Sequence, residues 1–513
     1  MPSTLKTPGV YIEEKNAFPN SVVGIPTAVP AFIGYTEKAV KSGGKSAINQ
    51  PIRITSLAEF HTHFGGGITT KYTIAEAAEG EEGHFTSGGT DYTLTAAENT
   101  QAFLYNSIRL FYANGGGTAW IISVGTYADI TAGGIKPEKL KKGIEPLVRE
   151  LEPTMLLIPD ALLLGQEDYV DVSKQMLQHC GYKMRNRVAI LDVYDGYKDR
   201  KGETDIIESF RDAVGSDYLD FGISYYPWIK TTVTPASEID YENIDNLEAL
   251  QTALKAEVDK SALKDEAKQV LNDEIDALEV PEVGEEVTEE DKEKQILTEH
   301  QKLMSISPPY KELMKELREK MNLLPPGPAM AGIYTMVDNT RGVWKAPANV
   351  GIASTVAPSV SITHDEQEDL NVTLTGKSVN AIRAFVGEGV KVWGARTLDG
   401  NSQDWRYINV RRTMIFLEQS IKAAAKAYVF EPNDANTWVL MKGMLNNFLN
   451  NLWKQGALAG SSPGEAFQVM VGLGETMTPN DILDGIMRIT VKVAITRPAE
   501  FIVITFQQKM QES

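Results

Sequence analysis

The last strand-like stretch of the chain places the strongest constraint on its fold. Residues 489–495 alternate Ile or Val with Thr, Lys and Ala, which is the pattern of a strand with one buried face. Residues 497–500 interrupt this pattern, because Pro498 cannot donate to a strand ladder, and residues 501–506 (FIVITF) resume it. An isolated hairpin is marginally stable in water, and an apolar edge strand is normally covered. We therefore expect residues 488–513 to form a strand hairpin and arm that pair with neighbouring copies of the same chain.

The N-terminal end shows a similar pattern. Residues 7–14 begin with a Pro-Gly turn and continue as a short strand, without an obvious local partner. We interpret residues 1–30 as an arm that pairs with neighbouring subunits; a frayed terminus is the alternative. The inter-subunit strand residues predicted at the two ends are Val10, Tyr11, Ile12 and Glu13, and Phe501, Ile502, Val503, Ile504 and Phe506.

Strands alternate with helices between the two ends. This alternation predicts a parallel α/β sheet in residues 31–340, with a loop-rich insertion at 65–101 and an acidic helical hairpin at 240–322. The apolar run at 329–337 reads as one further strand. The strands predicted before it are 119–124, 155–159, 188–193 and 222–226.

The pattern in the last third of the sequence predicts a second domain, of the α+β class, at residues 341–487. Strand-like stretches at 376–385 and 390–393 precede helical patterns at 411–429, 433–455 and 479–487. In the last of these helices, Thr478 is suited to the N-cap and Pro479 to the first helical position.

Most of the negative charge lies in the helical insertion. Residues 240–300 hold 20 acidic and 6 basic side chains, so they carry −14 of the chain's net charge of −19. Such a charge would repel itself in contacts among many identical copies, whereas water and salt screen it over roughly 10 Å on an outer surface. We therefore expect the insertion to face outward.

Composition also bears on the class of protein. The net negative charge argues against nucleic-acid binding, and no run reaches the roughly 18 apolar residues of a membrane span, so we expect no direct membrane insertion. The first residues, MPSTLKTPG, lack the apolar core of a signal peptide, and the single Cys180 fits a reducing compartment.

Motifs for catalysis or cofactor binding fail on inspection. The G-x-S-x-G match at 460–464 is preceded by a helix and has Pro463 after the serine, which does not fit a nucleophile elbow. The Gly-Gly-Lys-Ser sequence at 43–46 lacks the first glycine of a phosphate loop, because position 39 is Ala39. None of the six histidines forms a metal-binding motif. We expect no catalytic, cofactor-binding or metal-binding residues and hence no enzyme; an unrecognised hydrolase on the α/β domain and a monomeric scaffold or adhesin remain as alternatives.

Residues 341–349, RGVWKAPAN, closely resemble the hallmark segment of contractile tail sheath proteins, which form the outer tube of contractile phage tails, tailocins and related injection particles. Further stretches agree with that family in order: 7–14, 22–29, 31–34, 111–116, 226–228, 325–327, 392–398, 408–412 and 430–433. The hallmark residues are Arg341, Gly342, Trp344, Lys345, Pro347 and Asn349. We interpret this segment as a core-packing loop that joins two domains, with Trp344 as its apolar anchor.

The resemblance implies an α/β and α+β multidomain fold. It implies an inner α+β sheath domain with exchanged terminal strands, and an outer α/β domain that is subtilisin-like, non-catalytic and extended by the helical insertion. It also implies a structural subunit that polymerises helically around an inner tube and contracts to drive the tube through a target envelope. No nucleotide is expected, and the loop composition of residues 16–20 suits a hinge between subunits.

The implied partners are many copies of the chain in stacked hexameric rings, the inner tube protein, and baseplate and terminal cap proteins. The implied location is the bacterial cytoplasm during assembly and then a phage tail or a phage-like contractile particle, in some systems released from the cell. The candidate tube contact is Asp481, Asp484 and Arg488; acidic residues near a helix N-terminus also suit the helix dipole, which is the alternative explanation.

Overall fold

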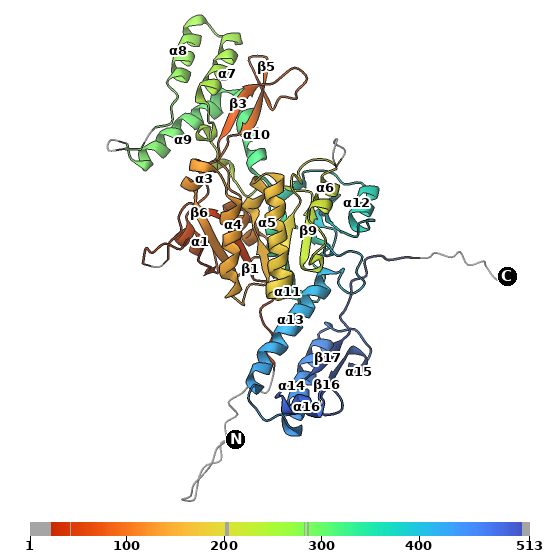
Figure 1. Ribbon diagram of the computed structural model, residues 1–513. Coiled ribbons are helices and arrows are strands. Elements are labelled where there is room, and N and C mark those ends of the chain that lie inside the picture. Colours follow the sequence, from red (N-terminus) through yellow and green to blue (C-terminus); the bar gives the residue numbers. More distant parts are fainter. Residues whose placement is uncertain (1–21, 42, 201–204, 282, 285–286, 505–513) are drawn as a thin grey trace, which may run out of the picture. The chain divides into compact units, whose positions relative to one another are not determined.

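The computed structural model describes residues 22–504 except 42, 201–204, 282 and 285–286 (Figure 1). The described residues form two compact units. The larger unit contains residues 26–412 and 497–504, and the smaller unit contains residues 22–25 and 413–496. The chain passes from one to the other within helix α13 (Ile408–Ala425), rather than at the boundary between residues 340 and 341 that the sequence suggests.

A nine-stranded sheet organises the larger unit, in the order β12-β15-β14-β9-β8-β7-β1-β6-β2. The six strands from β14 to β6 run parallel, which confirms the predicted parallel sheet, and the edge strands are antiparallel. Strands buried along their whole length are typical of a sheet covered on both faces. The strands are β1 (Pro30–Thr36), β2 (Ile52–Ile54), β6 (Ala119–Thr126), β7 (Met155–Leu157), β8 (Val188–Asp192), β9 (Gly222–Tyr226), β12 (Val350–Gly351), β14 (Asn380–Phe385) and β15 (Gly389–Val392).

Helices cover both faces of this sheet. Phe32 of β1 packs edge-on against Phe111 of α2 (Leu104–Ala113), with ring centroids 5.5 Å apart. The next residue, Ile33, points to the other face, where a Cβ on Gly143 of α4 (Pro137–Ile144) would lie 2.6 Å from its side chain. Adjacent residues of a strand face opposite ways, so α2 and α4 lie on opposite faces. The other helices around the sheet are α1 (Leu57–Phe64), α3 (Tyr127–Gly133), α5 (Gln166–Gln178), α6 (Ile206–Ala213), α11 (Gly327–Arg341) and α12 (His364–Asn371).

Residues 329–337 form part of helix α11, so their prediction as a strand is wrong. Ten of the fifteen residues of α11 are buried. A helix buried on nearly every side has no polar face, and its apolar run cannot be distinguished by periodicity from a buried strand. Gly332 permits the close packing of α11 on α2, because a Cβ there would lie 2.5 Å from the carbonyl oxygen of Phe111.

The two insertions build one subdomain with a shared core, which lies at the top of Figure 1. Residues 72–96 form a three-stranded antiparallel sheet rather than a loop, and residues 247–321 form four helices rather than a hairpin of two. We call residues 67–101 and 235–322 together the insertion subdomain. Its elements are β3 (Tyr72–Glu76), β4 (Phe85–Ser87), β5 (Thr90–Ala96), α7 (Leu247–Lys260), α8 (Asp265–Asp276), α9 (Glu289–Ile306) and α10 (Pro308–Met321).

Packing and hydrogen bonds join the two halves of the insertion subdomain. Ile74 and Leu94 of its sheet share a core with Leu250 of α7 and Leu313 of α10. The side chain of Asn246 bonds both backbone groups of Ile74, accepting from its N–H at 2.9 Å and donating to its carbonyl oxygen at 2.8 Å. An amide side chain used in this way replaces the strand partner that Ile74 lacks on that side.

The insertion subdomain leaves the body and returns to it at adjacent points. Strand β10 (Ile229–Thr231) pairs antiparallel with β11 (Leu323–Leu324), with Lys230 opposite Leu323. Strand β13 (Thr355–Pro358) completes this small sheet on the other side of β10. The side chain of Asn322 accepts from the N–H of Thr234 and donates to its carbonyl oxygen, which holds the two connections together.

The smaller unit packs helices against a two-stranded sheet. Strand β17 (Thr490–Val493) pairs antiparallel with β16 (Phe467–Met470), so the strand at 489–495 finds its partner within the chain. This corrects the expected hairpin with residues 501–506, of which residues 501–504 lie in no strand. The remaining elements are the end of α13, α14 (Ala435–Lys454), α15 (Pro463–Ala466) and α16 (Pro479–Leu483), and residues 22–25 lie against α13, where Ile25 N–H donates to Ser420.

Deleting one insertion alone, and then both together, tests whether they share a core. Replacing residues 235–321 alone with a short Gly-Ser linker should expose the apolar face of the β3-β5-β4 sheet and cause aggregation, because Phe85 and Leu94 lose their cover. Replacing residues 72–96 as well should restore a soluble chain, since Tyr72 pairs with Ala96 and the cut ends are already neighbours. Size-exclusion chromatography and circular dichroism measure both outcomes, and a soluble, well-folded single deletion would contradict the shared core.

Candidate functional site

The hallmark segment forms a tight loop between helix α11 and edge strand β12. Gly342 ends the helix in the left-handed region with φ 87°, and its N–H donates to the carbonyl oxygen of Asp338 at 3.0 Å. The indole of Trp344 lies so close to Gly342 that an added Cβ would stand 2.4 Å from the ring. Position 342 therefore requires glycine both for its backbone conformation and for the space that Trp344 occupies.

The loop packs on two elements of the larger unit, α13 and β15. The carbonyl oxygen of Trp344 accepts from the side chain of Asn409 in α13 at 2.8 Å. Val343 and Ala346 are buried. Asn349 donates its N–H to Val392 of β15 at 2.8 Å and accepts from the Lys391 ammonium at 3.2 Å. Of the other hallmark residues, Arg341 is exposed, Lys345 is half-buried and Pro347 is buried. Three residues of the segment are therefore buried and Trp344 is half-buried, and the segment joins two elements of the larger unit rather than two domains.

Two arginines at the start of α13, to which sequence reasoning assigned no role, hold that end of the helix. Arg412 makes a bidentate ion pair with Asp338 of α11, at 3.0 and 2.6 Å, and both side chains are almost fully buried. Arg411 pairs with Asp220 and lies between the rings of Trp405 and Phe221, 3.7 and 4.3 Å from their centroids. The sequence signal was two adjacent arginines at the start of an apolar helix, because such charges are buried only when they are paired; their aspartate partners lie far away in the sequence.

Glu500 anchors the start of the C-terminal arm. Its carboxylate accepts a bidentate pair of bonds from buried Arg396, at 3.0 and 2.6 Å, together with bonds from Asn371 at 2.9 Å and Tyr407 at 3.2 Å. Burial by itself would raise the pKa of Glu500, but the bonds from Arg396 and Asn371 outweigh burial and hold the pKa below its usual value. The carboxylate is therefore ionised and fixed to the larger unit at neutral pH.

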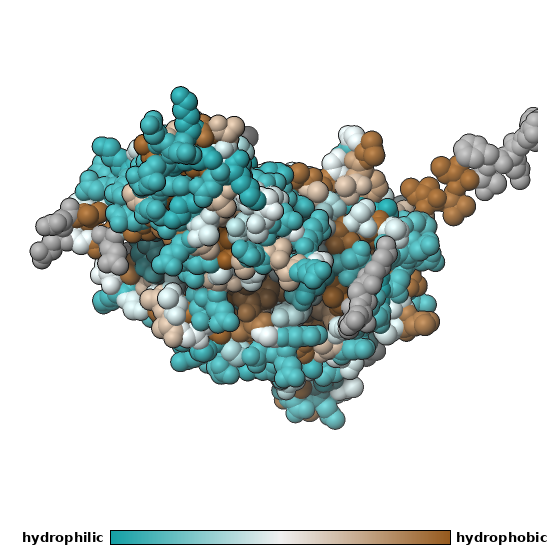
Figure 2. Space-filling view, turned by 90° about the horizontal axis from the view of Figure 1, so that it is seen from above, coloured by the Kyte–Doolittle hydropathy of each residue, from teal (hydrophilic) through white to brown (hydrophobic). Residues whose placement is uncertain are grey.

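An apolar segment continues directly from this anchor. Phe501, Ile502, Val503 and Ile504 are 71%, 78%, 88% and 69% exposed, which is unusual for four consecutive apolar side chains. They form the brown segment beside the grey C-terminal residues in Figure 2. The other predicted strand residues, Val10 to Glu13 and Phe506, and the expected hinge at 16–20 lie outside the described residues.

The candidate tube-contact residues cluster at helix α16, which ends earlier than expected. Asp484 is its C-cap and Gly485 follows at φ 69°, so the helix stops at Leu483 rather than near residue 487. Asp481 accepts from the N–H and hydroxyl of Thr478 and from Arg488 at 2.9 Å, and these bonds lower its pKa to about 2. Asp481 is thus the third helical residue of a capping box with the N-cap Thr478, while Asp484 is exposed.

Two buried carboxyl groups lie where the parallel strands β7 and β8 end, the edge at which α/β enzymes usually bind ligands. Asp160 accepts backbone N–H bonds from Tyr35, Phe103 and Leu104 at 2.7 to 2.9 Å and so caps α2. Asp192 accepts from the N–H of Gly327 at 2.7 Å and caps α11. Burial raises the pKa of Asp160 to about 6 and that of Asp192 to about 7. Both carboxyl groups therefore already accept hydrogen bonds from N–H groups at the start of a helix.

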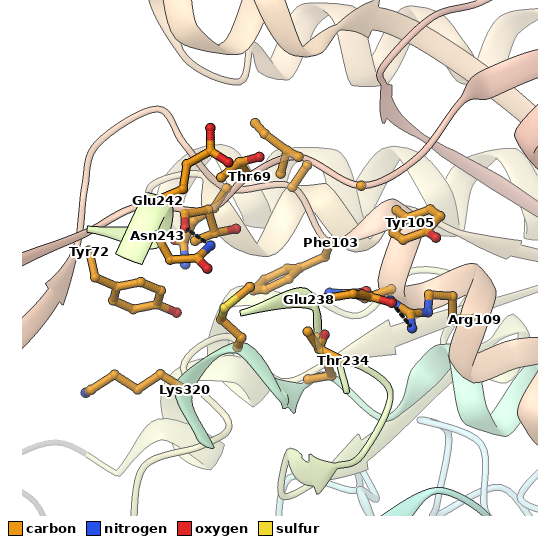
Figure 3. Close-up of a pocket in the computed structure, with 18 of the residues that line it drawn as sticks. Thr69, Tyr72, Phe103, Tyr105, Arg109, Thr234, Glu238, Glu242, Asn243 and Lys320 are labelled. Atoms are coloured by element: carbon orange, nitrogen blue, oxygen red, sulfur yellow. Dashed lines mark hydrogen bonds and ion pairs between the residues drawn. The ribbon is translucent and has the colours of Figure 1, made fainter. Parts of the chain in front are cut away.

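A cleft of about 350 Å³ lies where the insertion subdomain meets the body of the larger unit (Figure 3). Arg109 and Glu238 point toward one another in it and form a bidentate ion pair at 2.7 and 3.0 Å. Lys320 lies 3.1 Å from His84, and burial lowers the pKa of both groups. The described residues that line the cleft include no histidine or cysteine.

Among the described residues, no three acidic, histidine or cysteine side chains are placed together to hold a metal ion. None of the helices in this part of the chain has the length and apolar character needed to cross a bilayer.

Removing one carboxylate oxygen tests the anchor. Glu500→Gln should lower the free energy of unfolding by about 3 kcal/mol, because Arg396 would remain buried without its counter-ion. Asp404→Asn is the matched control, since Asp404 lies 3.9 Å from Arg497 and is 81% exposed; it should change stability by less than about 0.5 kcal/mol. Urea unfolding of the full chain measures both, and equal effects would argue against the anchor.

The two buried aspartates should respond differently to replacement by asparagine. The folded-state pKa of Asp192, about 7, lies above its unfolded value near 4, so the folded chain binds more protons between these values and its stability falls as pH rises from about 4 to 7. Asp192→Asn keeps an acceptor for Gly327 and should flatten this dependence, leaving the variant more stable than the native chain near pH 7.5.

Asp160→Asn is the comparison for that experiment. Both oxygens of Asp160 accept backbone N–H bonds, so an amide nitrogen in place of either oxygen would face a donor and destabilise the chain at every pH. Thermal unfolding between pH 4.5 and 7.5 separates the two variants. A steeper pH dependence in Asp192→Asn would contradict the assignment.

Part of the chain matches a known protein family. Residues 401–509 match the family model for the phage tail sheath C-terminal domain. The chain is 29% identical over 142 residues to the tail sheath protein of Salmonella phage ViI, and 27% identical over 135 residues to that of Burkholderia phage BcepMu. These matches cover 27% and 25% of this chain and only 22% and 28% of the two relatives.

Solved structures extend the similarity. The sheath of the extracellular contractile injection system PVC, in its contracted state, is 25% identical with a TM-score of 0.58, and the match covers 99% of both chains. The contracted helical sheath of the anti-feeding prophage is 26% identical with a TM-score of 0.60, and the match covers 99% of this chain and 100% of that one. The chain is therefore similar to contractile sheath proteins along its whole length, and its residues 401–509 match the phage tail sheath C-terminal domain.

Proposed function

We propose that the protein is the structural subunit of a contractile sheath, which polymerises helically around an inner tube and contracts to drive the tube through a target envelope. One observation carries this proposal: nearly the whole chain aligns with two sheath proteins in contracted assemblies. The proposed partners are further copies of the chain in stacked rings, an inner tube protein, and baseplate and cap proteins. The proposed location is the bacterial cytoplasm and then a phage tail or phage-like particle.

In this proposal the larger unit corresponds to the outer, subtilisin-like and non-catalytic domain, and the smaller unit to the inner sheath domain. Support for a structural role comes from the carboxyl edge of the sheet, where Asp160 and Asp192 cap helices. The acidic insertion subdomain faces outward. Contraction draws on a more favourable set of contacts in the contracted array, without nucleotide.

The C-terminal arm supplies a strand to a neighbouring copy. Glu500 fixes the point of departure, and the four residues after it have strand-forming side chains, are largely exposed and lie in no strand. The β16-β17 sheet of the smaller unit has only two strands, which is fewer than a sheet normally needs for stability in water. Strand addition between copies would give the arm a partner strand and the sheet a third strand, with main-chain hydrogen bonds supplying the affinity. The N-terminal strand, Val10 to Glu13, acts in the same way.

The tube contact is proposed at helix α16. Asp484 and the 84% exposed Leu483 lie at its end, while Asp481 and Arg488 bond to each other. Asp484 is accordingly the residue of the three at which charge can be reversed without breaking the helix cap or the ion pair.

A single backbone donor tests the proposed strand exchange. Ile502→Pro removes the N–H that a ladder needs and should abolish the tubes or rings formed by the purified protein. The monomer should keep its stability to within about 0.5 kcal/mol, because Ile502 is 78% exposed. Ile502→Thr retains the N–H and the β-branched shape and is the matched control. Negative-stain electron microscopy and circular dichroism give the readout, and normal assembly of Ile502→Pro would overturn the exchange.

A further inference from the structure

The geometry of the insertion subdomain points to a docking groove for a basic amphipathic helix of another protein. The groove lies between helices α7, α8 and α9, within the larger unit. This inference goes beyond the proposed sheath function and does not depend on it, because the groove is formed by the insertion subdomain alone.

The groove is apolar inside and open at its mouth. It encloses about 200 Å³. Leu254, Ile275 and Leu303 form its buried floor, whereas Leu263 and Ile306 at its mouth are 47% and 54% exposed. Its remaining apolar lining comes from Val258, Leu271, Leu278 and Pro308.

Helices α8 and α9 have little other packing. Among the twelve residues of α8 only Ile275 is buried, and among the eighteen of α9 only Ile296 and Leu303 are buried. Helices of this length depend on burial of an apolar face for most of their stability. A ligand helix laid in the groove would supply burial that α8 and α9 lack.

The rim of the groove is acidic. Glu257, Glu274 and Glu299 border it, and its one basic side chain, Lys302, is paired with Glu274 at 2.9 Å. Residues 240–300, the stretch of sequence that contains α7, α8 and part of α9, carry a net charge of −14. An apolar floor with an acidic rim is complementary to a helix that has leucine-like side chains on one face and lysine or arginine beside them.

The size of the groove argues against a small molecule as its occupant, and its charge argues against a second copy of this chain. A volume of about 200 Å³ accepts one or two apolar side chains but falls below the roughly 300 Å³ at which small-molecule pockets begin. A second copy of this chain would bring its own charge of −19 to an acidic surface. The occupant is therefore a basic helix of a different protein.

The test uses the full chain and a labelled synthetic peptide. The probe is an 18-residue helix with leucine at every third and fourth position and lysine elsewhere, and its control replaces every lysine by glutamate. Fluorescence anisotropy should show saturable binding of the lysine peptide with a Kd below about 100 μM, weakened by added salt, and no binding of the glutamate peptide.

Two substitutions on helix α9 locate the binding. Ile306→Asp at the mouth of the groove should weaken binding at least about tenfold. Leu297→Asp is the matched control: Leu297 is also 54% exposed, does not line the groove, and lies nine residues away, about two and a half turns and hence on the opposite side of α9. It should change the Kd by less than about twofold, and circular dichroism verifies that both variants fold.

Several results would overturn the inference. They are the absence of saturable binding, equal binding of the glutamate peptide, or equal losses from Ile306→Asp and Leu297→Asp. Analytical ultracentrifugation of the protein without peptide, at a salt concentration that prevents assembly, adds a further outcome: self-association lost in Ile306→Asp alone would assign the groove to a second copy instead.

Discussion

Helix α11 can be buried on nearly every side only because each of its polar features has a partner. The carboxyl group of Asp192 accepts the N–H of Gly327 at its start, and Gly342 ends it with a bond to Asp338. Asp338 also holds Arg412 of α13 in a buried ion pair. The sheet, the hallmark loop and the start of the helix that leads to the smaller unit all depend on this one element, since unpaired polar groups in such a position would be costly.

The sequence predicts those parts of the fold whose patterns are local. The parallel sheet follows from alternating apolar strands and amphipathic helices, and the N-cap at Thr478 follows from Pro479 at the first helical position. Helix α11 escapes prediction because burial removes the polar face that would mark it as a helix. Strand β17 pairs with β16, about twenty residues earlier, and no local pattern distinguishes that partner from residues 501–506.

The shared core of the insertion subdomain is a longer-range case of the same difficulty. Residues 67–101 and 235–322 are separated by more than a hundred residues, and each reads separately as a surface addition. What points to the shared core is that the three-stranded sheet cannot bury its apolar face alone. With Ile74 and Leu94 on one face, this sheet needs another element to cover that face. The hallmark residues could be named from resemblance, but the anchor at Glu500 depends on Arg396, Asn371 and Tyr407, which approach it only in three dimensions.

The pairing of β10 with β11 has a consequence for how such chains change over evolution. A segment that leaves and returns through two adjacent strands can be lost or lengthened without moving the sheet that carries it. The segment at 235–322 is not independent, however, because five of the nineteen buried residues in its core come from residues 72–96. Relatives should therefore gain or lose the two segments together, so that the lengths of two distant stretches of sequence vary as one character.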